Sequence, residues 1–128
     1  MRKNVKDNMK NMNFKVKTIE RILKTIIGDA NVSSGSSVIN THGQDCSYHV
    51  GQNPDLVAWP KNREQISEIA KLCSSHRFPI IPYGTGTGLE GGLSALNGGL
   101  CLNLQKLDQI LDYNPEDFDV KVQPGITR

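Results

Sequence analysis

The chain has 128 residues, of which 37% are hydrophobic and 22% are charged, and its net charge at pH 7 is +2. This composition is that of one folded domain and excludes an intrinsically disordered chain. The small net charge gives no basis for a nucleic-acid partner, and no apolar run reaches the roughly 18 residues that cross a bilayer. The three cysteines are scattered and odd in number, which argues against a disulfide framework.

The chain begins with a polar segment and an amphipathic helix. Residues 1–13 are polar, and we expect them to be disordered. Residues 14–27 carry an apolar stripe at helical spacing, and Gly28 follows, where a helix end favours a residue that can take positive φ. This start shows neither a secretory signal nor a clear mitochondrial presequence. Residues 31–51 then read as a polar loop, with His42 and His49 solvated.

Short strands and a second helix follow the loop. Asn62 caps this helix, with Gln65 three residues on, and its buried face carries Ile66, Ile69, Ala70 and Cys73. The expected strands cover residues 56–59, 78–83, 100–104, 109–113 and 118–122. Strand, helix and strand over residues 56–83 predict parallel pairing, so the fold class is α+β, with a small mixed sheet and flanking helices.

A glycine-rich segment at Gly84–Gly92 is the strongest candidate for a binding site. Five of its nine residues are glycine, so few Cβ atoms keep a ligand from the backbone. Successive N–H groups in such a loop can form an anion-binding concavity, and Thr85 and Thr87 add hydroxyl donors. The alternative is a flexible loop without a ligand. The segment lacks the long helix of a Rossmann fingerprint, the Gly-Lys-Ser/Thr of a P-loop and the strand lysine of a kinase.

Residues 54–128 resemble the PCMH-type FAD-binding domain of the vanillyl-alcohol-oxidase-like flavoproteins. The resemblance is carried by residues 54–60, 79–92, 98–104, 114–118 and 124–127, and upstream residues 42–45 are similar to the family's segment ahead of the first strand. Within the family the chain looks like the cytochrome-linked, mitochondrial D-lactate dehydrogenases. Glycolate and 2-hydroxyglutarate dehydrogenase-like flavoproteins are the alternatives within the family. Residues 14–128 would then form the N-terminal part of the FAD-binding domain.

The resemblance implies FAD as the cofactor, with its pyrophosphate held by the glycine loop. The implied cofactor-binding residues are Pro82, Tyr83, Gly84, Thr85, Gly86, Thr87, Gly88, Leu89, Glu90, Gly91 and Gly125. It further implies hydride transfer from a D-2-hydroxy acid to FAD, electron transfer to cytochrome c, and a mitochondrial location, with a cytoplasmic one as the alternative. The family's catalytic residues lie in a substrate (cap) domain that is absent from this chain, so we assign no catalytic residue and expect the chain alone to be inactive. Residues 79–99 contain no histidine or cysteine, so we expect the FAD to be non-covalent.

A zinc-binding module is the alternative from another class of protein. Cys46 and His49, together with Cys73 and His76, would make a tetrahedral two-cysteine, two-histidine set. Against this, Cys73 lies on the apolar stripe of its helix, where a buried thiol is the commoner outcome. His76 lies near the end of the same helix, where its ring can interact favourably with the negative end of the helix dipole.

Overall fold

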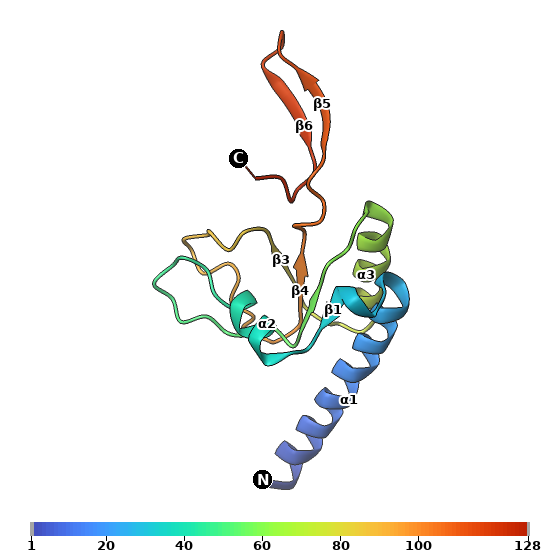
Figure 1. The fold of residues 1–128 in the computed structure, drawn as a ribbon. Helices are drawn as coiled ribbons and strands as arrows, with labels where there is room; N and C mark the ends of the chain where they lie inside the picture. Colours follow the sequence, from blue (N-terminus) through green and yellow to red (C-terminus); the bar gives the residue numbers. More distant parts are fainter. Residues whose placement is uncertain (1, 128) are drawn as a thin grey trace.

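The computed structural model describes the backbone of residues 2–127 and the side chains of residues 11–127. Helices and strands form an α+β arrangement, as the sequence predicts (Figure 1). The helices are α1 (Arg2–Ile27), α2 (Ser36–His42) and α3 (Arg63–Ser75), with a short 3₁₀ turn, η1, at Asp29–Asn31. The strands are β1 (Val32–Ser33), β2 (Leu56–Ala58), β3 (Ile80–Tyr83), β4 (Leu100–Asn103), β5 (Ile110–Asn114) and β6 (Asp119–Val122).

A four-stranded sheet with the order β1-β2-β4-β3 lies at the centre of the fold. Strands β2, β4 and β3 are parallel, and β1 pairs antiparallel with β2. The sequence predicts parallel pairing of β2 with β3; the two strands are parallel, but each pairs with β4, which lies between them. Because parallel strands end at the same edge of a sheet, Tyr83 of β3 and Asn103 of β4 lie side by side at the carboxyl edge.

Helices α1 and α3 cover one face of this sheet. The buried residues of this layer form the main core: Ile19, Leu23, Ile27, Val32, Leu56, Ala58, Ile69, Cys73, Phe78, Leu100 and Leu102. Ala70 is exposed, which corrects its expected place on the buried face, because it lies about 100° around the helix from buried Ile69. Residues 2–13, expected to be disordered, continue α1 in the structure; no proline or glycine interrupts them.

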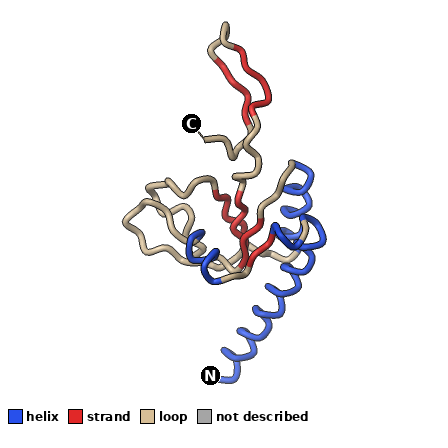
Figure 2. The backbone as a smooth tube through the Cα atoms, in the orientation of Figure 1, coloured by secondary structure: helices blue, strands red, loops and turns tan. Residues whose placement is uncertain are grey.

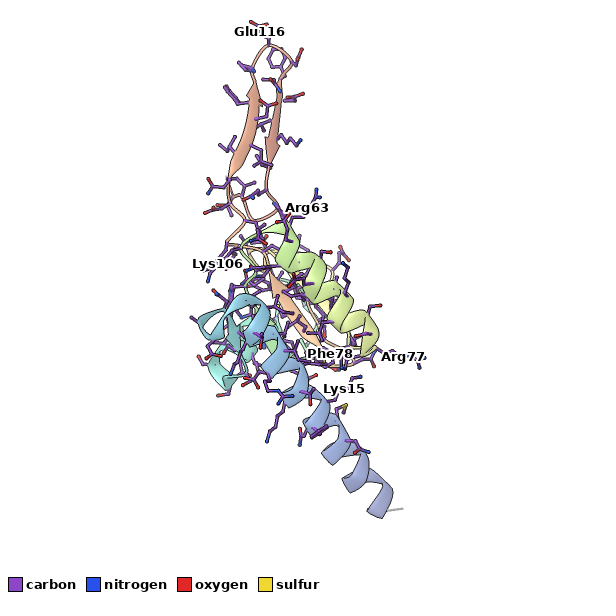
Figure 3. The ribbon with its side chains drawn as sticks, turned by 90° about the vertical axis from the view of Figure 1, so that its right-hand side faces the viewer. Lys15, Arg63, Arg77, Phe78, Lys106 and Glu116 are labelled. Atoms are coloured by element: carbon purple, nitrogen blue, oxygen red, sulfur yellow. The ribbon has the colours of Figure 1, made fainter. Side chains whose placement is uncertain are left out.

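Helix α3 begins as the sequence predicts and ends against α1. The Gln65 N–H donates to Asn62 Oδ1 at 2.9 Å, which satisfies a backbone donor that the helix leaves free. Past its end, Arg77 takes a positive φ of 47°, and its carbonyl oxygen accepts a hydrogen bond of 3.3 Å from Lys15 Nζ. The same ammonium group lies 5.8 Å from the centroid of the Phe78 ring (Figure 3), so α1 and α3 are also linked outside their apolar core.

The opposite face of the sheet is covered by α2 and by loops, which Figure 2 shows in tan beside the strands. Val57, Tyr83 and Cys101 are buried here, with Val38, Ile39, Trp59 and Leu93 packed against them. Two loops, residues 43–55 and residues 84–99, complete this side of the molecule. This layer therefore contains more loop than the helical one, and it includes the glycine segment.

Strands β5 and β6 form a separate two-stranded hairpin that projects away from the sheet, with Glu116 near its tip (Figures 1 and 3). Its exposed apolar side chains are Ile110, Leu111, Tyr113, Phe118, Val120 and Val122. Phe118 is 97% exposed and takes a positive φ of 56°, an uncommon conformation for an aromatic residue. Among the described helices, none is long and apolar enough to cross a membrane.

Candidate functional site

The glycine segment leaves β3 at the carboxyl edge of the parallel strands. Tyr83 is the last residue of β3, and Gly84 begins the loop directly beside the end of β4. In open sheets with parallel strands, ligands bind in the crevice outside the carboxyl ends of the strands. The sheet topology therefore places the segment where a ligand is expected.

An open hollow of about 460 Å³ lies against this loop. A hollow of this volume falls within the range of small-molecule and cofactor sites, roughly 300–1,000 Å³. The residues that line it are Asp45, Pro82, Gly84, Thr85, Gly86, Thr87, Gly88, Leu89, Glu90, Gly92 and Leu93. Neither lysine nor arginine is among them, so the groups that could attract an anion here are backbone dipoles and hydroxyl groups, in a lining that also contains the carboxylates of Asp45 and Glu90.

Gly86 is required by the geometry of the loop for two reasons. Its φ of +76° is one that side-chain-bearing residues rarely adopt. A Cβ at this position would also lie 2.8 Å from Tyr83 Oη, because the Tyr83 ring packs directly beneath it. Gly84 differs, since a Cβ there would have no atom within 4 Å. The absence of a side chain at Gly84 thus leaves space on the open side of the loop.

The loop offers hydrogen-bond donors that the protein itself does not use. Within the described residues, no backbone N–H from Thr85 to Glu90 donates to a protein acceptor. The hydroxyl groups of Thr85 and Thr87 lie 3.1 Å apart and contact each other. Unused N–H groups beside an open hollow fit the oxygen atoms of a phosphate or pyrophosphate group. This donor set suits the pyrophosphate of FAD.

The loop after α2 closes one side of the glycine loop, a contact that sequence analysis did not identify. The Cys46 N–H donates to the Gly88 carbonyl oxygen at 3.0 Å, and Asp45 lines the hollow. Hydrogen bonds from the Ser47 side chain and backbone, with smaller effects of the Gly91 and Leu93 amides, hold the pKa of Asp45 below its ordinary value. Asp45 Oδ2 is closed off from solvent and has no hydrogen-bond partner among the described residues. The only indication of this contact in the sequence is the resemblance of residues 42–45 to the family's upstream segment.

His42 lies beneath the loop and is buried, in contrast to the solvated position that its polar surroundings predict. It is the last residue of α2 and is 9% exposed. Its ring packs edge-on against Trp59, with ring centroids 5.5 Å apart, and tilted against Tyr83 at 4.6 Å. The turn of α2 directs the imidazole toward the sheet, which the local sequence pattern does not reveal. His49, by contrast, is exposed as expected and stacks on Tyr48.

The structure does not assemble the zinc site considered from the sequence. Among the described residues, no group of three or more His, Cys, Asp or Glu side chains could hold a metal ion. Cys73 is buried in the helical core, where desolvation raises the pKa of its thiol to about 11. Cys46 is exposed in the loop on the other face of the sheet. The two Cys-x-x-His pairs are therefore separated by the sheet, and the zinc hypothesis is wrong.

The sequence-predicted binding residues fall into four positions. The hollow is lined by Pro82, Gly84, Thr85, Gly86, Thr87, Gly88, Leu89 and Glu90. It is also lined by Gly92, which belongs to the candidate segment but not to the implied cofactor-binding residues, and by Leu93, which sequence analysis did not include. Tyr83 is 8% exposed and supports the loop from below, and Gly91 faces the His49 ring in an adjoining depression. Gly125 does not line the hollow: its N–H donates to the Leu107 carbonyl oxygen, and a Cβ there would collide with the carbonyl oxygens of Leu104 and Leu107.

A family model described as an FAD-binding domain matches residues 54–128, which include the whole glycine loop. The chain belongs to the FAD-binding domain family. This membership confirms the resemblance drawn from the sequence, and FAD is accordingly the cofactor of this domain. A solved structure with the same fold is that of p-cresol methylhydroxylase with substrate bound, at a TM-score of 0.78 and 22% identity, covering 88% of this chain and 23% of that one.

Several curated relatives carry names of 2-hydroxy-acid enzymes. The chain is 49% identical over 120 residues to a probable mitochondrial D-lactate dehydrogenase of Danio rerio, covering 90% of this chain and 24% of the relative. It is 38% identical over 106 residues to the mitochondrial D-lactate dehydrogenase [cytochrome] of Arabidopsis thaliana, covering 81% of this chain and 18% of the relative. It is 34% identical over 110 residues to the glycolate oxidase subunit GlcD of Bacillus subtilis, covering 86% of this chain and 23% of the relative. The chain thus spans a quarter or less of the length of these relatives.

Proposed function

We propose that this chain forms the pyrophosphate-binding part of the FAD-binding domain of a flavin-dependent D-2-hydroxy-acid dehydrogenase. The observation that carries the proposal is that residues Thr85 to Glu90 line an open hollow, and that their backbone N–H groups donate to no protein acceptor within the described residues. The position of the loop at the carboxyl edge of the sheet supports the same assignment.

The binding role is divided between backbone and side chains. Residues 84–88 hold the pyrophosphate through N–H groups and the hydroxyls of Thr85 and Thr87, and Leu89, Glu90 and Gly91 complete the curve of the loop. Pro82 and Tyr83 fix the point where the loop leaves β3. Gly125 acts at a distance from the hollow, by allowing close packing of the segment after β6 against Leu104 and Leu107.

The reaction belongs to the whole protein, and this chain contributes binding and orientation to it. When bound, FAD supplies a flavin ring that can accept a hydride from the hydroxyl-bearing carbon of a 2-hydroxy acid. The names of the Danio rerio and Arabidopsis thaliana relatives favour D-lactate as substrate, and the Bacillus subtilis relative's name keeps glycolate as the alternative. The Arabidopsis thaliana name also supports cytochrome c as electron acceptor and a mitochondrial location. No catalytic residue is assigned within this chain.

The test uses the full-length protein, meaning a chain of the relatives' length that contains these residues. Purified protein is loaded with FAD, and D-lactate, L-lactate, glycolate and D-2-hydroxyglutarate are added separately without oxygen. We expect D-lactate to bleach the flavin absorbance fastest, and reduced protein to pass electrons to cytochrome c. Purified protein that takes up no FAD would contradict the binding role, whereas uptake of FAD without bleaching by any of these acids would contradict the substrate class alone.

A further inference from the structure

His42 belongs to a buried polar cluster directly below the glycine loop. Its Nδ1 lies 2.7 Å from the Val38 carbonyl oxygen, and its Nε2 lies 2.9 Å from Asn103 Nδ2. Asn103 is fully buried and His42 is nearly so. Both ring nitrogens are therefore engaged inside the protein, and the ring has a single orientation.

The neighbours of Asn103 determine which nitrogen of His42 carries the proton. The Gln105 N–H donates to Asn103 Oδ1 at 2.9 Å, and Asn103 Nδ2 lies 3.1 Å from Gln105 Oε1. These two contacts orient the Asn103 amide with its NH₂ group toward His42. Because an amide NH₂ only donates, Nε2 of His42 must accept, and Nδ1 carries the hydrogen that is donated to the Val38 carbonyl. The geometry requires a neutral imidazole.

The same imidazole supports the glycine loop through one intervening ring. The His42 and Tyr83 rings are tilted at 43° with centroids 4.6 Å apart. The Tyr83 hydroxyl in turn lies under Gly86, so close that a Cβ on Gly86 would be 2.8 Å from it. A shift of the imidazole would thus be transmitted to the floor of the loop, because buried side chains in contact cannot move independently.

We propose that His42 is a positioning residue for FAD binding: as the neutral Nδ1–H tautomer it holds Tyr83 beneath Gly86, and protonation of Nε2 disrupts this support and weakens FAD binding. The inference rests on the proposed function, because it takes the glycine loop as the FAD site.

Protonation of His42 Nε2 would place two hydrogen-bond donors opposite each other. A hydrogen on Nε2 would face the Asn103 NH₂ group, and the amide could reverse only by giving up both contacts with Gln105. The titratable groups around the ring do not offset this change. Desolvation raises the pKa of Tyr83, and it raises that of the neighbouring Cys101 thiol to about 12, so both are neutral at and below neutral pH. Cys46 also lies near Tyr83, and the Asp45 carboxylate is engaged by Ser47.

The test is a titration of full-length apoprotein with FAD at several pH values between about 7.5 and about 5.5. FAD keeps its pyrophosphate charge over this range. We expect the wild-type protein to bind FAD about tenfold more weakly at the acid end, the typical effect of an unmet buried hydrogen bond. Asn103→Asp should remove this pH dependence, since a carboxylate oxygen can accept the Nε2 hydrogen. His76→Gln, at the far end of α3, is the matched control and should keep the wild-type profile.

Two outcomes would overturn the inference: wild-type affinity that does not change with pH, or an Asn103→Asp profile identical to that of the wild type. Nitrogen-15 spectra of histidine-labelled wild-type protein give a second readout that needs no variant, and finding the hydrogen of His42 on Nε2 at neutral pH would also overturn it. Gly86→Val in the same titration separates a failure of the FAD site from a failure of the role of His42. Wild-type affinity in that variant would contradict the FAD site itself, whereas the tautomer measurement tests His42 independently.

Discussion

Replacing Gly86 with valine should separate FAD binding from folding. A side-chain-bearing residue at φ +76° costs about 1–2 kcal/mol, and the contact of its Cβ with Tyr83 Oη adds about 1–3 kcal/mol of overpacking. The loop can relieve both effects by moving away from Tyr83, because within the described residues the N–H groups from Thr85 to Glu90 make no protein hydrogen bonds, and the carbonyl oxygens of Gly86 and Gly88 are held only by Cys46. The penalty should therefore be seen mainly as lost FAD affinity. A loss of about 2 kcal/mol corresponds to roughly 30-fold weaker binding.

The assay is a fluorescence titration of full-length apoprotein with FAD, with circular dichroism and thermal melting of the apoprotein to monitor the fold. Gly84→Ala is the matched variant, since its methyl group meets no protein atom within 4 Å and faces only open space. We expect it to leave the apoprotein melting temperature unchanged and to weaken FAD binding only by occupying part of the hollow. If Gly86→Val folds and retains wild-type FAD affinity, the assignment of the pyrophosphate to this loop is incorrect.

Three further predictions concern the thiols, the cofactor link and the hairpin. Of the three thiols in this chain, only Cys46 should react with a thiol reagent in the native protein; reaction of all three without denaturant would refute this. The contribution of the two buried thiols to stability should be constant below about pH 9 and should fall as the pH rises further. Burial raises the pKa of Cys73 from 9.0 to about 11 and that of Cys101 to about 12, so the folded state keeps protons that the unfolded thiols lose. Acid precipitation of the full-length protein should release FAD into the supernatant, since residues 79–99 contain no histidine or cysteine; flavin fluorescence that stays with the polypeptide would show a covalent link. The isolated chain should bind a hydrophobic dye through its exposed hairpin, and Phe118→Asn, which removes an exposed ring and tolerates φ 56°, should reduce that binding; unchanged dye fluorescence would place the apolar surface elsewhere.

Local patterns in the sequence were sufficient for most elements and for the glycine loop. The apolar stripe before Gly28, the Asn62 cap and the short β-rich runs all depend on residues within a few positions of one another, and the structure contains the corresponding helices and strands. The loop could be recognised for the same reason, because its glycine spacing is a property of one continuous segment. The α+β class followed from the order of these elements.

Contacts between distant segments were decided only by the tertiary structure. No local pattern indicates that β4 lies between β2 and β3, or that Cys46 is held against Gly88 while Cys73 lies in the core on the other face of the sheet. The polar sequence around His42 predicted solvent, and the structure instead buries the ring against Tyr83 and Asn103. Burial and hydrogen-bond partners depend on which segments meet in space. The sequence by itself therefore determined the elements and the glycine loop that we propose as the FAD site, and the tertiary structure decided which residues support that loop.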